Sequence, residues 1–344
     1  MNKQSFGPLA DGRETTLFTL TNNSGMSVSI TDYGGTIVNI LVPDRIGQIG
    51  DVSLGHECAA DYENNEAFMG CLIGRHANRI ANGQFQLDGV SYQLAINNPP
   101  NNLHGGPGGF HSKIWLVDEA THSKLALRTT SSDGEEGFPG NIEVQVIYSL
   151  SHADELTIEY RGRTDAPTVM NLTNHAYFNL AESGRVDDHE VQIFADQITL
   201  VDDVSIPTGE FLEVAGTPFD LRQPSRIGNG LESDHEQIKL GSGYDHNFVI
   251  QNGGDRLIQA AKVSEPITGR IMDVFTTEPG IQLYTGNFLK GQVGKFGQIY
   301  NPHTGFCLET QKFPASPNKP HFPSAVLRPD EEYQQTTIYQ FSVK

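Results

Sequence analysis

The chain has 344 residues, a length that suits either two domains of ordinary size or one large β-sandwich. Its 36 glycines and 18 prolines make it rich in turns, and hydrophobic residues make up 37% of it, enough for a large core. Because 23 Lys and Arg side chains stand against 42 Asp and Glu side chains, the net charge is −19, which argues against nucleic acids and anionic membranes as partners. The composition favours an all-β protein, and the negative charge favours a neutral small molecule as its ligand.

The cysteines and the amino terminus indicate a cytoplasmic protein. Cys58, Cys71 and Cys307 are odd in number and lack CxxC spacing, so we expect reduced core thiols rather than disulfides or a zinc site. The first residues contain no apolar run of signal-peptide length, and no later run approaches the roughly 20 apolar residues of a membrane span.

The first part of the chain alternates like a β protein. Val28 and Ile30, and then residues 37–42, predict two strands joined by a turn. Residues 57–66 predict a short acidic helix. Arg75 and Arg79 follow among apolar residues, where each needs a partner, and a structural ion pair is as plausible as a ligand contact.

Residues 97–115 read NNPPNNLHGGPGGFHSKIW and predict an irregular loop, because this mixture of Asn, Pro and Gly suits neither a helix nor a central strand. The loop carries His104 and His111, and the glycines after His104 would let a ligand approach it closely. Taken alone, such a loop is more often a surface turn with solvated histidines.

A hairpin follows the loop. Residues 125–129 and 142–150 alternate in polarity across a turn, and residues 156–160 add a third strand, so we predict an antiparallel meander with one buried face. Neither a repeat nor a linker marks a boundary, which predicts one domain over residues 1–344.

Residues 171–180, NLTNHAYFNL, predict a strand with an apolar and a polar face. Alternation places Thr173, His175, Tyr177 and Asn179 on the same side. A histidine and a tyrosine that share a face are well suited to hold a polar ligand, although a lone buried histidine is also common.

Near the carboxyl end, two more segments alternate in the same way. Gln282 lies opposite the apolar side of residues 281–284, and Glu309 lies opposite the apolar side of residues 306–311, so each polar group is held on a rigid strand. Asp245 precedes another strand, where a simple turn role is also possible. The proline-rich residues 312–324 predict a rigid loop before a last strand at residues 333–343.

These candidate residues can be tested against several kinds of binding and catalysis. The GGPGG segment lacks the GK[ST] of a phosphate-binding loop. Histidines and Glu309 could bind a metal, but no pair has the spacing that makes such an assignment specific. Asp245 and Glu309 would allow glycoside hydrolysis.

Six segments together resemble the motifs of one family, the aldose 1-epimerases or galactose mutarotases. In family order, they read GRHANRIANGQF, NNLHGGPGGFHSKIW, NLTNHAYFNL, GYDHNF, GIQLYTGNF and GFCLETQKFPASPNKPHFPS. Six motifs in register over nearly the whole chain are specific, whereas any one would be weak. The resemblance implies a large antiparallel β-sandwich that interconverts the α and β anomers of free aldohexoses such as galactose and glucose, with neither cofactor nor metal.

The resemblance also implies roles for individual residues. His175 corresponds to the general acid, Glu309 to the general base, and His104 to a residue that assists beside the reacting centre. The implied sugar contacts are Asn78, Arg79, His104, Tyr177, Asp245 and Gln282.

The chemistry of mutarotation agrees with these roles, because ring opening needs one group to take the anomeric hydroxyl proton and another to protonate the ring oxygen. A carboxylate near His175 would raise its pKa and favour the imidazolium. A glycoside hydrolase and a non-catalytic carbohydrate-binding module remain alternatives, whereas a hexose-6-phosphate epimerase would need a basic cluster that is absent from the sequence. We expect a free aldose as the partner, no nucleic acid or membrane, and a monomer or homodimer.

Overall fold

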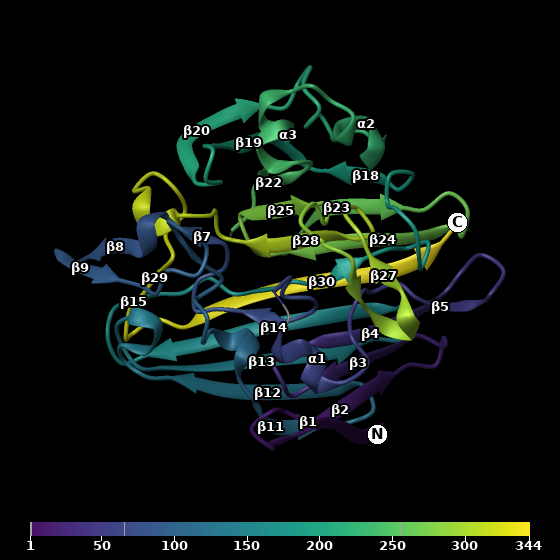
Figure 1. Cartoon of the computed structure of the whole chain (residues 1–344), viewed down its shortest axis with the longest axis horizontal. Helices are drawn as coiled ribbons and strands as arrows, with labels where there is room; N and C mark the ends of the chain where they lie inside the picture. The colour runs from purple at the N-terminus through teal and green to yellow at the C-terminus, as the bar shows by residue number, and fades with distance from the viewer. Residues whose placement is uncertain (1, 65, 255) are drawn as a thin grey trace.

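The computed structural model describes residues 2–64, 66–254 and 256–344, and strands dominate it. In Figure 1 the nine-stranded sheet runs from β11 (Leu116–Ala120) near the bottom to β18 (Glu190–Ile193) near the top, and the five-stranded and six-stranded sheets overlap its lower and upper parts in this view. The strands within each of these three sheets pair in antiparallel fashion. The all-β class and the antiparallel architecture predicted from the sequence are therefore confirmed. The extent of the domain stays a prediction.

The first sheet has five strands in chain order and contains the amino-terminal part of the chain. Its strands are β1 (Asn2–Pro8), β2 (Glu14–Thr21), β3 (Ser27–Thr31), β4 (Ile37–Pro43) and β5 (Ile49–Asp51). The predicted strands around Val28 and residues 37–42 are confirmed as β3 and β4.

The largest sheet has nine strands, and its middle is the predicted meander. In spatial order its strands are β11 (Leu116–Ala120), β12 (Lys124–Ser131), β13 (Ile142–Leu150), β14 (Glu155–Thr164), β30 (Tyr333–Val343), β24 (Arg270–Thr276), β23 (Ile258–Ser264), β18 (Glu190–Ile193) and β21 (Ser225–Arg226). Buried and less buried residues alternate along β14 and β30, as expected for a sheet with one face in the core.

The third sheet has six strands and carries most of the predicted site. In spatial order they are β17 (Tyr177–Phe178), β28 (Phe306–Gln311), β25 (Gly280–Tyr284), β22 (Asp245–Ile250), β19 (Ala195–Val201) and β20 (Pro207–Glu213). All residues of β25 and β28 are buried, so both faces of these central strands are covered.

Short elements complete the chain. The two-stranded pairs are β6 (Leu72–Ile73) with β16 (Thr173–Asn174), β7 (Arg79–Ile80) with β10 (Asn102–Leu103), β8 (Gln84–Leu87) with β9 (Val90–Gln93), β15 (Thr168–Val169) with β29 (Val326–Leu327), and β26 (Gln292–Val293) with β27 (Ile299–Tyr300). The α-helices are α1 (Ala59–Glu63), α2 (Ile227–Leu231) and α3 (Glu236–Gly241), and α1 confirms the predicted short helix. In the described part of the chain, no helix is long and apolar enough to cross a membrane.

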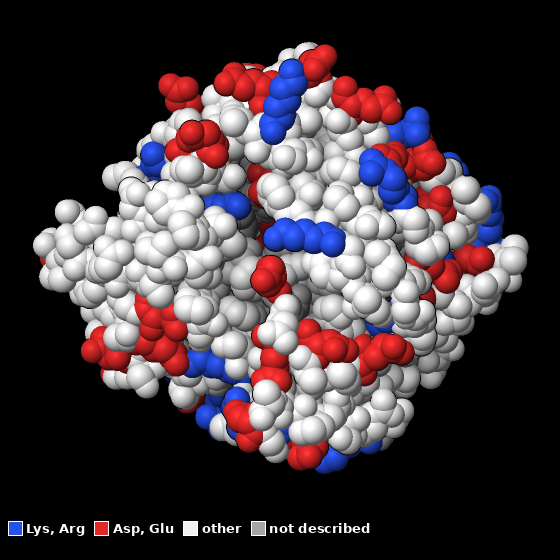
Figure 2. All heavy atoms as spheres, viewed as in Figure 1, with Lys and Arg blue, Asp and Glu red and all other residues white. Residues whose placement is uncertain are grey.

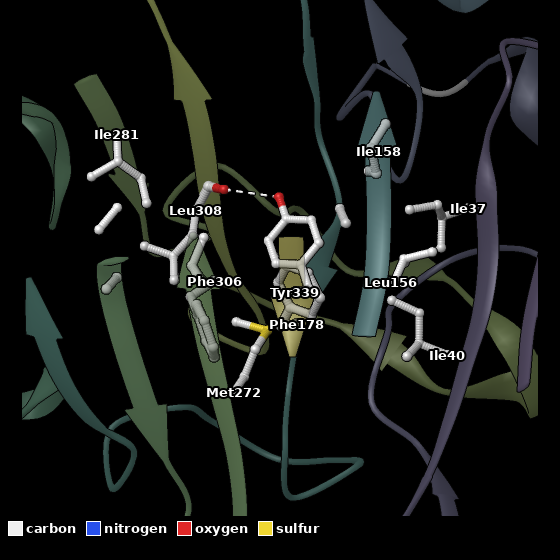
Figure 3. Close-up of a cluster of buried hydrophobic side chains, with 14 of the residues drawn as sticks. Ile37, Ile40, Leu156, Ile158, Phe178, Met272, Ile281, Phe306, Leu308 and Tyr339 are labelled. Carbon is white, nitrogen blue, oxygen red and sulfur yellow. Dashed lines mark hydrogen bonds between the residues drawn. The ribbon is translucent and has the colours of Figure 1, made fainter. Parts of the chain in front are cut away.

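The main core lies where the nine-stranded sheet meets the other two. Figure 3 shows Leu156 of β14 facing Ile37 of β4, and Tyr339 of β30 facing the strand that carries Leu308. The Tyr339 hydroxyl donates a hydrogen bond to the Leu308 carbonyl at 3.1 Å, which joins the two layers beneath β28. The core therefore packs against the inner face of β28, the strand that carries Glu309.

Two local predictions need correction. Residues 171–180 do not form one strand: β16 pairs with β6, β17 pairs with β28, and His175 lies between them where the chain passes from one sheet to the other. Alternation along a single strand therefore did not set the direction of His175. The prediction of three core thiols is wrong for Cys58, which is partly exposed, whereas Cys71 and Cys307 are buried; none of these three cysteines forms a disulfide.

Candidate active site

A cavity of about 480 Å³ opens on the outer face of the six-stranded sheet. Figure 2 shows this side of the molecule hollowed near its centre, with charged side chains of both signs around the hollow. Most of the residues predicted for the site line the cavity, namely Asn78, Arg79, His104, His175, Tyr177, Asp245 and Glu309.

Cross-strand register aligns the polar residues of the cavity floor. Gln282 of β25 pairs with Glu309 of β28, and two residues further along β25, on the same face, Tyr284 pairs with both Asp245 and Cys307. Residues paired in this way project to the same face of a sheet. Three neighbouring central strands therefore hold these side chains on a rigid surface, as the alternation of residues 281–284 and 306–311 predicted.

Arg79 and Asp245 form the ionic part of the site. Nη1 of Arg79 lies 3.7 Å from Oδ2 of Asp245, and Nε of Arg79 donates a hydrogen bond to Asn98 at 3.0 Å. Gln282 donates to the other oxygen of Asp245 at 2.7 Å. Gln282 is 3% exposed and is not among the lining residues, so its link to the cavity is its hydrogen bond to Asp245. Arg75 is different: its guanidinium bonds to Ser131 and backbone carbonyls in the core, so that arginine is structural.

His175 is held between aromatic rings. Its ring stacks on Tyr177 with centroids 5.1 Å apart, and the Phe68 ring lies 6.2 Å away. The backbone N–H of His175 donates to the Cys71 carbonyl at 2.9 Å. Nε2 of His175 lies 3.7 Å from Oε2 of Glu309, which places the predicted acid beside the predicted base.

Burial controls the protonation of this pair. Loss of water raises the pKa of Glu309 well above its usual value, and the negative charge of Asp245 raises it further, while Arg79 opposes both effects. Burial also lowers the pKa of His175 to about 4. As expected, a nearby carboxylate, that of Asp245, raises the pKa of His175, but the loss of hydration outweighs this effect and the net shift is downward.

His104 sits on the predicted irregular loop in the left-handed backbone region, with φ of +54°. The next residue, Gly105, has no room for a side chain, because a Cβ there would lie 2.0 Å from the Gly74 carbonyl oxygen. Nδ1 of His104 accepts a hydrogen bond from the backbone N–H of Asn78 at 3.2 Å, and its ring lies 5.2 Å from that of His175. Burial and the neighbouring His175 lower the pKa of His104 well below its usual value.

Sequence reasoning missed the aromatic part of the wall. Phe68, Tyr284 and Phe288 line the cavity. Tyr284 had a usable signal, because it shares the alternate face of its strand with Gln282, whereas Phe68 and Phe288 lie in loops where periodicity carries no information. His111 packs against Phe68 and is not among the lining residues.

A model of the family described as aldose 1-epimerase matches residues 16–340 of the chain. The chain belongs to the aldose 1-epimerase family. A galactose mutarotase from Sus scrofa is 44% identical over 100% of this chain and 99% of its own length. An aldose 1-epimerase from Escherichia coli (strain K12) is 39% identical over 96% of each chain.

Solved structures share this aldose 1-epimerase fold. An aldose epimerase homologue from C. elegans superimposes with a TM-score of 0.89 at 30% identity, covering 95% of this chain and 98% of that one. A galactose 1-epimerase from Lactobacillus acidophilus NCFM gives a TM-score of 0.86 at 31% identity over 99% and 98% of the two chains. The antiparallel architecture described above is therefore that of aldose 1-epimerases.

The same aldose 1-epimerase cavity brings together three groups that could hold a metal ion. Donor atoms of His104, His175 and Glu309 all lie within 4.8 Å of one another, a grouping that the sequence spacing did not reveal. A histidine that binds a metal normally donates its other N–H to an acceptor, but the second nitrogen of His104 faces the N–H of Asn78. His104 would have to give up that hydrogen bond to bind a metal through Nε2, so the donor set fits a metal poorly.

Proposed function

We propose that this chain is an aldose 1-epimerase that interconverts the α and β anomers of free aldohexoses, galactose and glucose among them, by general acid and base catalysis. The observation that carries the proposal is the pairing of His175 with Glu309, 3.7 Å apart, on the wall of a cavity of about 480 Å³. Membership of the aldose 1-epimerase family and the full-length similarity to a galactose mutarotase support the same reaction.

Ring opening needs a proton removed from the anomeric hydroxyl and a proton delivered to the ring oxygen. In the proposed scheme Glu309 takes the first proton as a carboxylate, and His175 gives the second from Nε2. Rotation about the first carbon–carbon bond then presents the other face of the aldehyde, and the two residues exchange roles during closure. The protein ends each cycle in the protonation state in which it began.

The remaining polar groups suit a sugar that is held by its hydroxyls. Arg79, Asp245 and Asn78 offer donors and acceptors on the cavity wall, and Gln282 fixes the orientation of Asp245. Both oxygens of Asp245 have protein partners, which favours a role in substrate orientation over that of a second catalytic carboxylate in glycoside hydrolysis. His104 would donate a hydrogen bond beside the reacting carbon.

The proposal extends to the setting in which the enzyme works. A free aldose is the proposed partner, because the cavity has few cations to bind a phosphate and the whole chain carries a net charge of −19. We propose that the protein acts in the cytoplasm as a monomer or homodimer, and three cysteines that form no disulfide support a reducing compartment.

Polarimetry tests the reaction directly. Freshly dissolved α-D-galactose and α-D-glucose should reach their equilibrium rotation faster with the protein than without it, in proportion to protein concentration. A protein that binds galactose without changing this rate would indicate a carbohydrate-binding module, and release of the phenol from an aryl galactoside would indicate a glycoside hydrolase. Either result would refute the proposal.

A further inference from the structure

Cys307 touches the catalytic pair, although the sequence presented it only as a core thiol. It lies on β28 two residues before Glu309, and it is 0% exposed. Its Sγ lies 3.5 Å from Nδ1 of His175, within hydrogen-bonding reach for sulfur. One strand therefore presents a carboxyl group near one nitrogen of the His175 ring and a thiol near the other.

The two histidines of the cavity differ in what faces Nδ1. In His104, Nδ1 accepts the backbone N–H of Asn78 at 3.2 Å, so the proton of the neutral ring must sit on Nε2. In His175, the group at Nδ1 is the sulfur of Cys307, which can accept or donate. The surroundings of Nε2 therefore decide which of the two ring nitrogens of His175 carries the proton.

Nε2 of His175 faces Glu309. Oε2 of Glu309 lies 3.7 Å away and has no hydrogen-bond partner within the part of the chain that the structure describes. In the proposed reaction Nε2 of His175 gives up a proton and takes it back, so the proton that stays on the neutral ring must sit on Nδ1. The sulfur of Cys307, 3.5 Å from Nδ1, is the group placed to accept that N–H.

We propose that Cys307 is a positioning residue that accepts the Nδ1–H of His175, so that the cavity holds two histidines in opposite tautomers, His175 with its proton on Nδ1 and His104 with its proton on Nε2. The catalytic consequence rests on the proposed function. Nε2 of His175 is then free to take and give the proton that moves in each half of the reaction, while His104 is a fixed donor. Protonation of His104 at Nδ1 would break its bond to Asn78.

The choice of a thiol also has a chemical consequence. A carboxylate at Nδ1 would stabilise the imidazolium and make it a weaker acid, as a buried opposite charge does. Burial raises the pKa of the Cys307 thiol well above its usual value, so the group stays uncharged. A neutral thiol orients the ring and leaves the protonated His175 acidic enough to protonate a ring oxygen.

The tautomers can be measured without any assay of activity. Protein labelled with 15N in its histidines is examined at pH 7.5 by long-range 1H–15N correlation, with His175→Asn and His104→Gln used to assign the two rings. We expect Nδ1 of His175 to resonate as a protonated nitrogen and Nε2 as an unprotonated one, with the reverse pattern for His104. A wild-type His175 with its proton on Nε2 would overturn the proposal, whether or not the protein catalyses mutarotation.

Substitutions then test the role of the thiol. Because one neutral hydrogen bond is lost, Cys307→Ala should lower kcat by about three- to tenfold with little change in KM, and the His175 signals should shift toward the other tautomer or an average of both. Cys307→Ser, whose hydroxyl can still accept, should restore the Nδ1–H signal and part of the rate. A Cys307→Ala variant with the wild-type tautomer and kcat would overturn the proposal.

Cys71→Ala provides the matched control. Cys71 is also a buried thiol, and its Sγ accepts a hydrogen bond from the Thr36 hydroxyl at 3.3 Å. Removing it should leave the His175 tautomer and kcat as in the wild type. If Cys71→Ala and Cys307→Ala lowered kcat equally with unchanged His175 signals, the effect would be general loss of packing and the proposed role of Cys307 would be wrong.

Discussion

Replacing Glu309 with glutamine should have opposite effects on two properties. It should lower the rate of catalysis, and it should make the protein more stable relative to the wild type as the pH rises. The amide keeps the shape of the side chain on β28 but cannot take the anomeric proton. Loss of a general base typically costs about 10²- to 10⁴-fold in rate, which corresponds to about 2.7 to 5.4 kcal/mol of transition-state stabilisation. We expect polarimetry to show a fall of that size in kcat, while galactose still binds, as titration calorimetry can measure.

The same substitution should make the folded protein relatively more stable as the pH rises. The folded-state pKa of Glu309 is raised above its unfolded value near 4.5, so the folded wild type binds this proton more tightly than the unfolded chain does. The stability linked to that proton is fully present below pH 4.5 and is lost as the pH rises toward the folded-state pKa. Glutamine has no such proton, so the melting temperature of Glu309→Gln minus that of the wild type should increase from pH 5 to pH 8.

Glu278→Gln is the control for both measurements. Glu278 is another buried carboxyl group with a raised pKa, but it is bound by the Tyr333 hydroxyl at 3.0 Å and lies 3.6 Å from Nζ of Lys312, outside the cavity. This variant should keep the wild-type rate. A near wild-type rate in Glu309→Gln, or an equal loss in Glu278→Gln, would refute the assignment of Glu309 as the base. A melting-temperature difference that does not change with pH would refute the reasoning on its protonation.

The other predictions concern the histidines, metal ions and the core. His175→Asn should lower kcat by about 10²- to 10⁴-fold with a modest change in KM, whereas His104→Gln should raise KM as well as lower kcat; the opposite pattern in steady-state polarimetry would exchange their roles. Activity should survive exhaustive chelation with EDTA, and loss that a divalent ion restores would contradict the scheme. Phe178→Ala should reduce the free energy of unfolding in denaturant titrations by about 3–5 kcal/mol, because Phe178 is 0% exposed and packs against Phe306 and Tyr339; a change below about 1 kcal/mol would show that the site collapses without a cavity.

Strand periodicity predicted the parts of the site that regular strands carry. Gln282 and Glu309 lie on β25 and β28 as alternation placed them, because the side-chain direction in a strand repeats every two residues. His175 was harder to place, since no local pattern shows that the chain leaves one sheet and enters another at that residue. The partners of Arg75 and Arg79 also could not be assigned from sequence, and the structure gives one to the core and one to the cavity.

The electrostatics of the site depended on contacts that only the fold creates. The pKa of His175 is lowered because burial excludes water from the ring, and the residues that pack against it include Phe68, which lies more than 100 positions earlier in the chain. The approach of Cys307 to the same ring requires the pairing of β17 with β28. The order of the motifs predicted which residues form the site. The pairing of distant strands determines the neighbours, and so the protonation, of each of these residues.

The contrast between strands and connecting segments around the cavity has a practical consequence for redesign. Glu309 is embedded in a strand that is buried on both sides and His175 is itself buried, whereas residues 203–205 and 288–290, which also line the cavity, belong to connecting segments. Insertions and substitutions in connecting segments leave sheet pairing intact. A library of variants confined to those two segments could therefore be screened for altered sugar preference. Every variant would keep the residues that transfer protons.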